Sequence, residues 1–314
     1  MYKLARPFFM LCESPLHAGS GNNLGVIDLP IQRERHTGFP KIEASGLKGC
    51  LRDVFERMSK IKLQNQTVTD EQDRQAVVKF MFGPETGNEH AAALGFTDAR
   101  LLLFPVKSMK GVFAWVTCPK VLSRFANDLR LCNLEPSFPV PKACSAARDS
   151  NLFVKDKDNK IVLEEYTFEI KHKDDEDVTR LAEWLAEHAL PQGEEYDYLR
   201  EKIRKDIVVL GDDDFRDFVH LSTEIVTRIR INNKKGTVQK GALFTEEYLP
   251  SETLLYAMVL VSPVFDDQNN YSKFFNENEE NIMKAFLDNK ANVLQLGGNT
   301  TIGKGLVRMV SLDA

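Results

Sequence analysis

The chain has 314 residues, 43% hydrophobic content and a net charge of −5, enough for one large domain or two with a sizeable core. It has no apolar run long enough to cross a bilayer, no signal-peptide pattern at the N-terminus, and five scattered cysteines without CxxC spacing. These features argue against a membrane protein, a disulfide framework and a zinc site, and they predict a cytoplasmic protein.

The negative charge is concentrated in one block. Between Asp156 and Asp217 there are 20 acidic and 10 basic residues, so the rest of the chain carries a net charge of +5. Because a local basic surface decides whether phosphate can bind, the whole-chain charge does not exclude a nucleic-acid partner. The acidic block itself is most simply a solvated face.

The first predicted element is a strand over 3–11, which Pro7 should place at the edge of a sheet. A loop of small residues follows over 18–25, and its backbone can approach a ligand closely. One carboxylate, Asp28, comes just after this loop.

A helix is predicted from Ser45 to about Lys60, with Ser45 as its N-cap. Lys48 and Arg52 lie one turn apart on this helix. A helix N-terminus with basic residues beside it is suited to binding a phosphate.

The middle of the chain should alternate short strands and helices. The predicted elements are a helix near 70–82 within the polar segment 61–98, a hairpin over 101–118, a helix over 119–131, a loop over 135–147, a strand over 161–170 and short acidic helices within 174–219. We interpret the acidic helices as part of an insertion rather than as a separate domain.

The last third should contain a hairpin, three further strands and a helix. The predicted elements are a hairpin over 223–244, a central strand over 253–261, a helix over 272–289, a strand over 293–296 and a final strand over 306–312. Without the insertions, the order approximates the α+β split βαβ arrangement, an antiparallel sheet with both helices on one face. RNA-binding domains share this framework.

The hairpin over 223–244 is a candidate nucleic-acid arm. Its basic residues include Arg228, Arg230, Lys234 and Lys235, and Leu243 and Phe244 are available to wedge between or stack on bases. The alternative is an ordinary solvent-facing hairpin.

The glycine-rich run from Gly298 to Gly305 nearly matches the phosphate-binding loop of nucleotide hydrolases. It lacks the Ser or Thr that would hold Mg²⁺, because Gly305 stands there, and a strand rather than a helix follows. An ATP site is therefore disfavoured. The glycines and Lys304 suit either contact with polynucleotide phosphates or a tight connection between strands.

A lone carboxylate such as Asp28 is commonly a turn residue, and two-metal nucleases need several clustered carboxylates. RNA carries its own nucleophile, the 2′-OH, so one carboxylate with a metal ion or a general acid such as His17 would suffice for cleavage. His17 also suits a structural role. Glu246 and Tyr248 would join the site only if the fold brings them there.

Three segments together resemble one known family. PLHAGSGNNLGVIDLPIQRERHTGFPKIEASGLKGCLR, TRIRINNKKGTVQKGALFTEEYLP and LQLGGNTTIGKGLVRM are similar, in the same order, to segments of the backbone subunits of type III-B CRISPR effector (Cmr) complexes, which are members of the RAMP superfamily. The resemblance covers both ends of the chain.

The resemblance implies a single RAMP domain with an RNA-recognition-type (ferredoxin-like) palm and a protruding thumb hairpin. The implied parts are a palm over about 1–60, 99–132 and 250–314, insertions over about 61–98 and 135–220, and a thumb over about 222–248. Its implied partners are the CRISPR RNA, single-stranded target RNA, copies of itself in a helical filament and other Cmr subunits.

The resemblance also implies an endoribonuclease that cuts target RNA at regular intervals with a divalent metal ion, Mg²⁺ or Mn²⁺. Asp28 matches the family's catalytic aspartate and is the candidate metal ligand, with His17, Glu246 and Tyr248 as helpers. Glu247 competes with Glu246 for its role. The implied guide contacts are Lys41, Ser45, Lys48, Arg52, Gly297, Gly298, Thr301, Gly303 and Lys304.

Three alternatives stay open at this point. The first is a non-catalytic RNA-binding scaffold in which Asp28 is idle. The second is a nuclease that processes CRISPR RNA as a lone protein. The third is an NTPase that uses the loop over 298–305.

Overall fold

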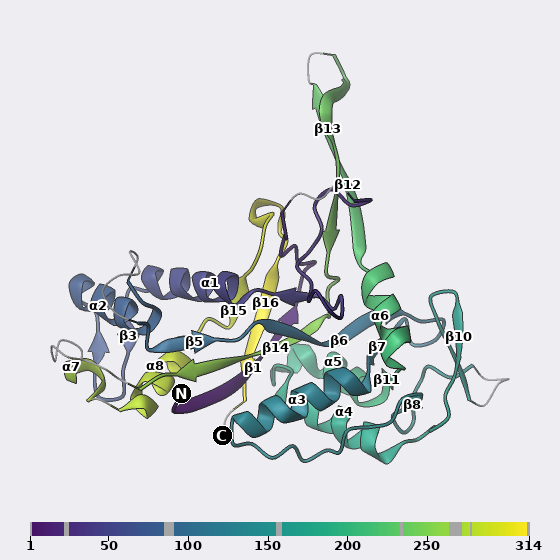
Figure 1. Ribbon diagram of the computed structural model, residues 1–314, viewed down its shortest axis with the longest axis horizontal. Helices are drawn as coiled ribbons and strands as arrows, with labels where there is room; N and C mark the ends of the chain where they lie inside the picture. The colour runs from purple at the N-terminus through teal and green to yellow at the C-terminus, as the bar shows by residue number, and fades with distance from the viewer. Residues whose placement is uncertain are drawn as a thin grey trace.

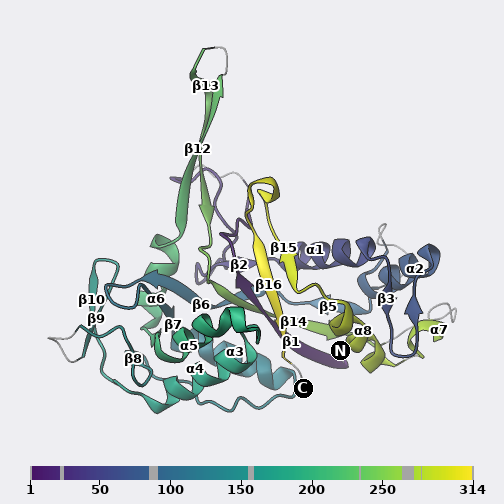
Figure 2. The same ribbon diagram turned by 180° about the vertical axis from the view of Figure 1, so that it is seen from behind.

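The computed structural model describes residues 2–21, 25–84, 91–154, 159–232, 235–263, 272–276 and 278–312. Figures 1 and 2 show a wide body of sheet and helices, from which the β12–β13 hairpin projects as a long arm. Among the described residues, no helix has the length and apolar character that a bilayer crossing would require.

One large sheet forms the middle of the body. Its strands lie in the order β15 (Val293–Gln295), β16 (Leu306–Ser311), β1 (Leu4–Cys12), β14 (Leu254–Val261), β6 (Ala99–Lys107), β7 (Phe113–Thr117), β11 (Ile207–Val209) and β8 (Ser145–Ala146). Two short strands, β2 (Lys41–Ile42) and β5 (Leu94–Phe96), pair with β6 and β14. Neighbouring strands are antiparallel except β7 and β11, which run parallel.

Strand β1 is central, so the prediction that Pro7 places it at an edge is wrong. The β1–β16 pairing begins with Phe8 opposite Ser311, which leaves Pro7 one residue beyond that ladder. Since no ladder N–H is needed there, the strand tolerates proline in the middle of the sheet.

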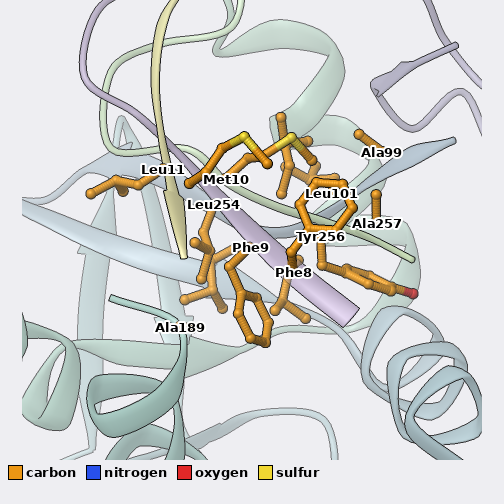
Figure 3. Packing of buried hydrophobic residues seen from close by; sticks show 14 of the residues in the cluster. Phe8, Phe9, Met10, Leu11, Ala99, Leu101, Ala189, Leu254, Tyr256 and Ala257 are labelled. Atoms are coloured by element: carbon orange, nitrogen blue, oxygen red, sulfur yellow. The ribbon is translucent and has the colours of Figure 1, made fainter. Parts of the chain in front are cut away.

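The two faces of the sheet are both covered. Phe8 of β1 packs on Phe286 of α8 (Glu279–Asn289), which stacks in turn on Phe55 of α1 (Ala44–Arg57). The next residue, Phe9, packs on the other face against Phe125 of α3 (Pro119–Leu131) and Trp184 of α4 (Glu176–His188). Figure 3 shows Phe8 and Phe9 among the buried residues.

The prediction that helices cover only one face therefore fails for the sheet as a whole. The physical reason is visible in β1, where Phe8, Phe9, Met10 and Leu11 are all buried in succession. A continuous apolar run is typical of a strand that is covered on both faces.

The remaining elements lie around this sheet. They are α2 (Glu71–Phe82), α5 (Asp197–Lys205), α6 (Asp212–Leu221), α7 (Ser272–Phe275), the short turns η1 (Glu194–Tyr196) and η2 (Thr300–Ile302), and the strand pairs β3 (Ile61–Lys62) with β4 (Thr67–Val68) and β9 (Lys160–Leu163) with β10 (Tyr166–Glu169). The predicted helices over 70–82 and 119–131 and the predicted hairpin over 101–118 are confirmed.

Two predicted elements are divided in the structure. The single helix expected over 272–289 is split into α7 and α8, because Asn276 has a left-handed φ of 49° and the Asn278 side chain caps the new helix through the Glu280 N–H at 2.8 Å. The single strand expected over 161–170 is the β9–β10 hairpin, which turns at Glu164 with a φ of 50°.

Candidate active site

The arm is the antiparallel pair β12 (Glu224–Asn232) and β13 (Thr237–Tyr248), which confirms the predicted hairpin. Its outer part carries exposed apolar side chains, including Ile229, Ile231 and Leu243. Arg230 and Lys235 are also exposed. The predicted RNA contact Lys234 lies outside the described residues.

The segment that carries Asp28 lies against the base of this arm. Leu29 forms a parallel bridge with Glu246 of β13. The Leu29 N–H donates to the Thr245 carbonyl at 3.0 Å, and the Glu247 N–H donates to the Leu29 carbonyl at 3.0 Å. Figures 1 and 2 show this purple segment beside the base of the arm from both sides.

Thr245 holds the Asp28 carboxylate. Asp28 Oδ2 accepts hydrogen bonds from the Thr245 N–H at 2.8 Å and the Thr245 hydroxyl at 3.0 Å. The same hydroxyl accepts from the Asp28 N–H at 3.0 Å. Because both donors stabilise the ionised form, they lower the pKa of Asp28, whose side chain remains exposed. The site thus presents a fixed, accessible anion.

Glu246 and Tyr248 form a hydrogen-bonded pair on the other side of β13. The Tyr248 hydroxyl donates to Glu246 Oε2 at 2.6 Å. Arg228 of β12 donates to Glu246 Oε2 and to the Tyr248 oxygen, both at 2.9 Å. Asn299 of the glycine-rich loop donates to Glu246 Oε1 at 3.2 Å and to the Tyr248 oxygen at 2.8 Å.

The network shifts both pKa values. Burial opposes ionisation of Glu246, but the hydrogen bonds from Tyr248, Arg228 and Asn299 outweigh it and lower the pKa of Glu246. Burial and the adjacent Glu246 raise the pKa of Tyr248. The pair is therefore an ionised carboxylate beside a neutral phenol at neutral pH.

His17 completes this side of the site. Its Nδ1 lies 2.7 Å from the Glu247 backbone carbonyl, which can only accept, so Nδ1 carries the hydrogen. The ring lies 5.5 Å from the Tyr248 ring between centroids. A Cβ atom built at Gly19 would lie 2.8 Å from Nε2, so glycine there leaves the second ring nitrogen uncovered by a side chain.

Glu246 and Glu247 have different surroundings. Glu247 accepts from the Ile31 N–H at 3.0 Å and the Thr223 hydroxyl at 2.9 Å, and it pairs with Arg33. It is 2% exposed and anchors the segment that follows Asp28. Of the two glutamates, only Glu246 shares hydrogen bonds with Tyr248.

The N-terminus of α1 differs from its prediction. Ser45 is not the N-cap, because the helix begins at Ala44 and its N-cap residue is Glu43. The Glu43 side chain makes no capping hydrogen bond. Asp98 instead accepts the Ala44 N–H at 2.9 Å through Oδ1 and the Lys41 ammonium at 2.8 Å through Oδ2. A carboxylate thus lies where the sequence predicted a phosphate.

The two basic residues farther along α1 also make internal contacts. Lys48 Nζ donates to the Leu94 carbonyl at 3.2 Å, and burial together with nearby Arg52 lowers the pKa of Lys48. Arg52 donates to Glu56 at 2.6 Å and to the Gly83 carbonyl at 3.0 Å. Their contact with a guide stays a prediction.

The glycine-rich loop joins β15 to β16 and packs on the His17 segment. A Cβ at Gly297 would lie 2.1 Å from the His17 carbonyl oxygen, and one at Gly305 would lie 1.9 Å from the Leu296 carbonyl oxygen. These two glycines are required by close backbone approach. Thr301 and Gly303 are exposed, and Lys304 Nζ lies 5.1 Å from the centre of the Tyr248 ring.

The described residues contain no group of three or more His, Cys, Asp or Glu side chains that could hold a metal ion. Asp28 is therefore not part of a metal cage supplied by the described part of the chain. A single exposed carboxylate fits a divalent ion only when substrate phosphates and water supply the other ligands, as is common for Mg²⁺.

Two further residues of the site were not singled out from the sequence, Thr245 and Asn299. Thr245 is an ordinary strand residue whose importance depends on the distant Asp28 segment. Asn299 gave a local signal, because asparagine next to glycine is typical of left-handed backbone, and its φ is 66°. That signal reveals a turn but not the contact with Glu246.

Known proteins are similar to this chain over nearly its whole length. The "CRISPR system Cmr endoribonuclease Cmr4" of Pyrococcus furiosus is 41% identical over 94% of this chain and 92% of its own length. The "CRISPR system CMR subunit Cmr4" of Saccharolobus solfataricus is 24% identical over 98% of this chain and 96% of its own.

Solved structures agree with these relatives. The structure "oligomeric Cmr4 from Pyrococcus furiosus" has a TM-score of 0.72 at 32% identity and covers 99% of this chain and 98% of its own. A chain of "Type III-B Cmr-beta bound to cognate target RNA" has a TM-score of 0.70 at 21% identity over 99% of this chain and 98% of its own, and so shares the fold. A family model described as the RAMP superfamily matches residues 10–308. The chain therefore belongs to the RAMP superfamily, in its Cmr4 family.

Proposed function

We propose that this protein is the backbone subunit of a CRISPR RNA-guided effector complex and that it cleaves target RNA complementary to the guide. The observation that carries the proposal is the position of Asp28, an exposed carboxylate held at the base of a projecting arm by Thr245. The relative named as an endoribonuclease, at 41% identity, supports the same activity.

The body of the molecule suits a ferredoxin-like palm. The strand order β16–β1–β14–β6, with α1 and α8 together on one face, has the form of a split βαβ arrangement. Because α3 and α4 cover the other face, bases cannot stack on the sheet as they do in RNA-recognition domains. RNA contacts must come from loops and from the arm.

We assign the guide backbone to the glycine-rich loop and the nearby part of α1, and the guide–target duplex to the arm. The exposed Ile229, Ile231 and Leu243 suit a wedge between base pairs, while Arg230 supplies positive charge. Copies of this chain would lie side by side along the guide, together with other subunits of a Cmr complex.

The proposed reaction is an attack by the target's own 2′-OH. The 2′-oxygen forms a bond to the adjacent phosphorus, the bond from phosphorus to the 5′-oxygen breaks, and a 2′,3′-cyclic phosphate remains. The 2′-OH loses its proton and the 5′-oxygen gains one. The arm would distort the duplex so that the attack is in line.

This chain's residues have separate proposed parts in that reaction. Asp28 is ionised at neutral pH and would assist the attack by accepting the 2′-OH proton. His17, when also protonated at Nε2, is the candidate proton donor to the leaving oxygen, and Tyr248, whose hydroxyl donates to Glu246, holds that carboxylate in place. A divalent ion shared by Asp28 and the RNA phosphates would neutralise phosphate charge.

The test is cleavage by a reconstituted complex that contains either the natural chain or Asp28→Asn. We expect at least about 100-fold slower cleavage with unchanged guide assembly, because the amide removes only the charge. Full activity in Asp28→Asn would show that this subunit is a scaffold. A 3′-OH product end would exclude the 2′-OH as the nucleophile.

The proposed metal dependence has its own test. We expect chelation by EDTA to stop cleavage by the assembled complex and added Mg²⁺ or Mn²⁺ to restore it. A matched gel-shift measurement on the same samples should show that target binding persists in EDTA. Cleavage at the full rate in EDTA would contradict a shared metal site at Asp28.

A further inference from the structure

The glycine-rich loop is joined to the candidate cleavage residues by direct contacts. The Gly298 N–H donates to the His17 carbonyl at 3.0 Å. The Asn299 side-chain amide donates to both Glu246 and Tyr248. The loop assigned to the guide backbone and the site assigned to target cleavage therefore share Asn299.

Asn299 determines where the Tyr248 proton points. The Tyr248 oxygen accepts one hydrogen bond from Asn299 at 2.8 Å and one from Arg228 at 2.9 Å. A hydroxyl oxygen has two lone pairs, so these donors fill both. The single Tyr248 hydrogen is left to donate to Glu246 Oε2, which lies 2.6 Å away.

The backbone conformation of Asn299 restricts which residues can stand at this position. Its φ of 66° and ψ of 30° lie in the left-handed region, where asparagine is among the few side chains that are readily accommodated. Both amide hydrogens of Asn299 are used, one on each acceptor. A glycine would keep the backbone conformation and lose only the side chain.

We propose that Asn299 is a positioning residue that couples the guide-contacting loop to the Glu246–Tyr248 pair. The inference rests on the proposed function, because it assigns a control element to the same cleavage site. A guide that fixes the loop also fixes the Asn299 amide, and the amide orients the Tyr248 hydroxyl. The orientation of the Tyr248 hydroxyl, and with it the cleavage rate, then depends on the loop assigned to the guide.

The experiment compares Asn299→Gly with Asn133→Gly in reconstituted complexes that contain guide and target RNA. Asn133 follows α3 and has a similar left-handed φ of 57°, so it provides the same chemical change away from the site. The measurements are guide retention, target affinity, and the single-turnover cleavage rate at saturating target.

We expect Asn299→Gly to cut about 10- to 100-fold more slowly, with guide retention and target affinity within about twofold of the natural chain. The Asn133→Gly complex should cut at the natural rate. Asn299→Asp should be at least as slow as Asn299→Gly, because a carboxylate cannot donate and repels Glu246.

Two results would overturn the inference while leaving the proposed function intact. One is a natural cleavage rate in Asn299→Gly or Asn299→Asp. The other is a loss of guide retention that accounts for the whole loss of cleavage, since Asn299 would then act only in guide binding. A natural complex that does not cut target RNA would instead overturn the proposed function.

Discussion

The base of strand β13 has two sides that hold two different parts of the chain. Thr245 and Glu247 bind the segment around Asp28, whereas Glu246 and Tyr248 bind the glycine-rich loop through Asn299. Successive strand residues point to opposite faces, so two adjacent glutamates have unrelated partners. We call the side with Thr245 and Glu247 the building side, because it holds the segment that carries Asp28. We call the side with Glu246 and Tyr248 the acting side, because its side chains are the proposed helpers in cleavage.

The largest expected effect is on the building side. Glu247→Ala removes the partner of Arg33 and the acceptor of the Ile31 N–H, so we expect it to lower the free energy of unfolding by about 3 kcal/mol. Urea unfolding measures this change. A loss of unfolding free energy smaller than about 1 kcal/mol would show that Glu247 does not have the structural role that separates it from Glu246.

The next effect is on the acting side. Glu246→Gln keeps the shape of the side chain but loses the charge that Arg228, Asn299 and Tyr248 contact. We expect the cleavage rate to fall about 10- to 100-fold, with unfolding free energy lowered by only about 1 kcal/mol. The same urea titration serves as the control, because a loss equal to that of Glu247→Ala would indicate a structural role.

A smaller effect is expected for Thr245, and it should appear in the pH dependence of the cleavage rate. The threonine hydroxyl and N–H lower the pKa of Asp28, so cleavage should be retained above that pKa and lost as pH falls through it. Thr245→Val removes only the hydroxyl donor, which raises the Asp28 pKa, and we expect the acid side of the rate profile to move to higher pH. Thr245→Ser should keep the natural profile. An unchanged profile in Thr245→Val would show that the Thr245 hydroxyl does not control the Asp28 pKa during cleavage.

The smallest effect on stability is expected at the outer part of the arm. Leu243 is 64% exposed and Ile231 is 55% exposed. Replacing both with alanine should change unfolding free energy by about 0.5 kcal/mol or less, because little surface is buried there. Cleavage of a bound target should nevertheless slow if these side chains wedge the duplex. An unchanged rate of target cleavage would show that these two side chains do not wedge the duplex.

Local patterns in the sequence predicted much of the fold. The arm, the helices over 119–131 and 70–82, and the central strand over 254–261 follow from periodicity and turn residues. The resemblance of three segments identified the family, and the structure places Asp28 beside the base of the arm.

Several of the errors came from distant contacts. Asp98 replaces Ser45 as the partner of the α1 N-terminus from 54 residues away, and the roles of Thr245 and Glu247 depend on a segment more than 200 residues earlier. Local spacing carries no information about such pairs. The break between α7 and α8 has a local cause. Asn276 turns the chain and Asn278 caps α8, but the apolar residues on both sides of the break continue the helical spacing, which predicted a single helix.

The residues of the site are distributed widely along the chain, which links the site to the folding of the domain. His17, Glu246 and Asn299 are far apart in the sequence and are brought together by the β1–β16 pairing, the Gly298–His17 bond and the bond from Asn299 to Glu246. The contacts between these segments depend on the pairing of β16 with β1, so the site is a product of the tertiary fold. Cleavage activity and the folded state of the whole domain should therefore be lost together, because no short stretch of the sequence contains all three residues.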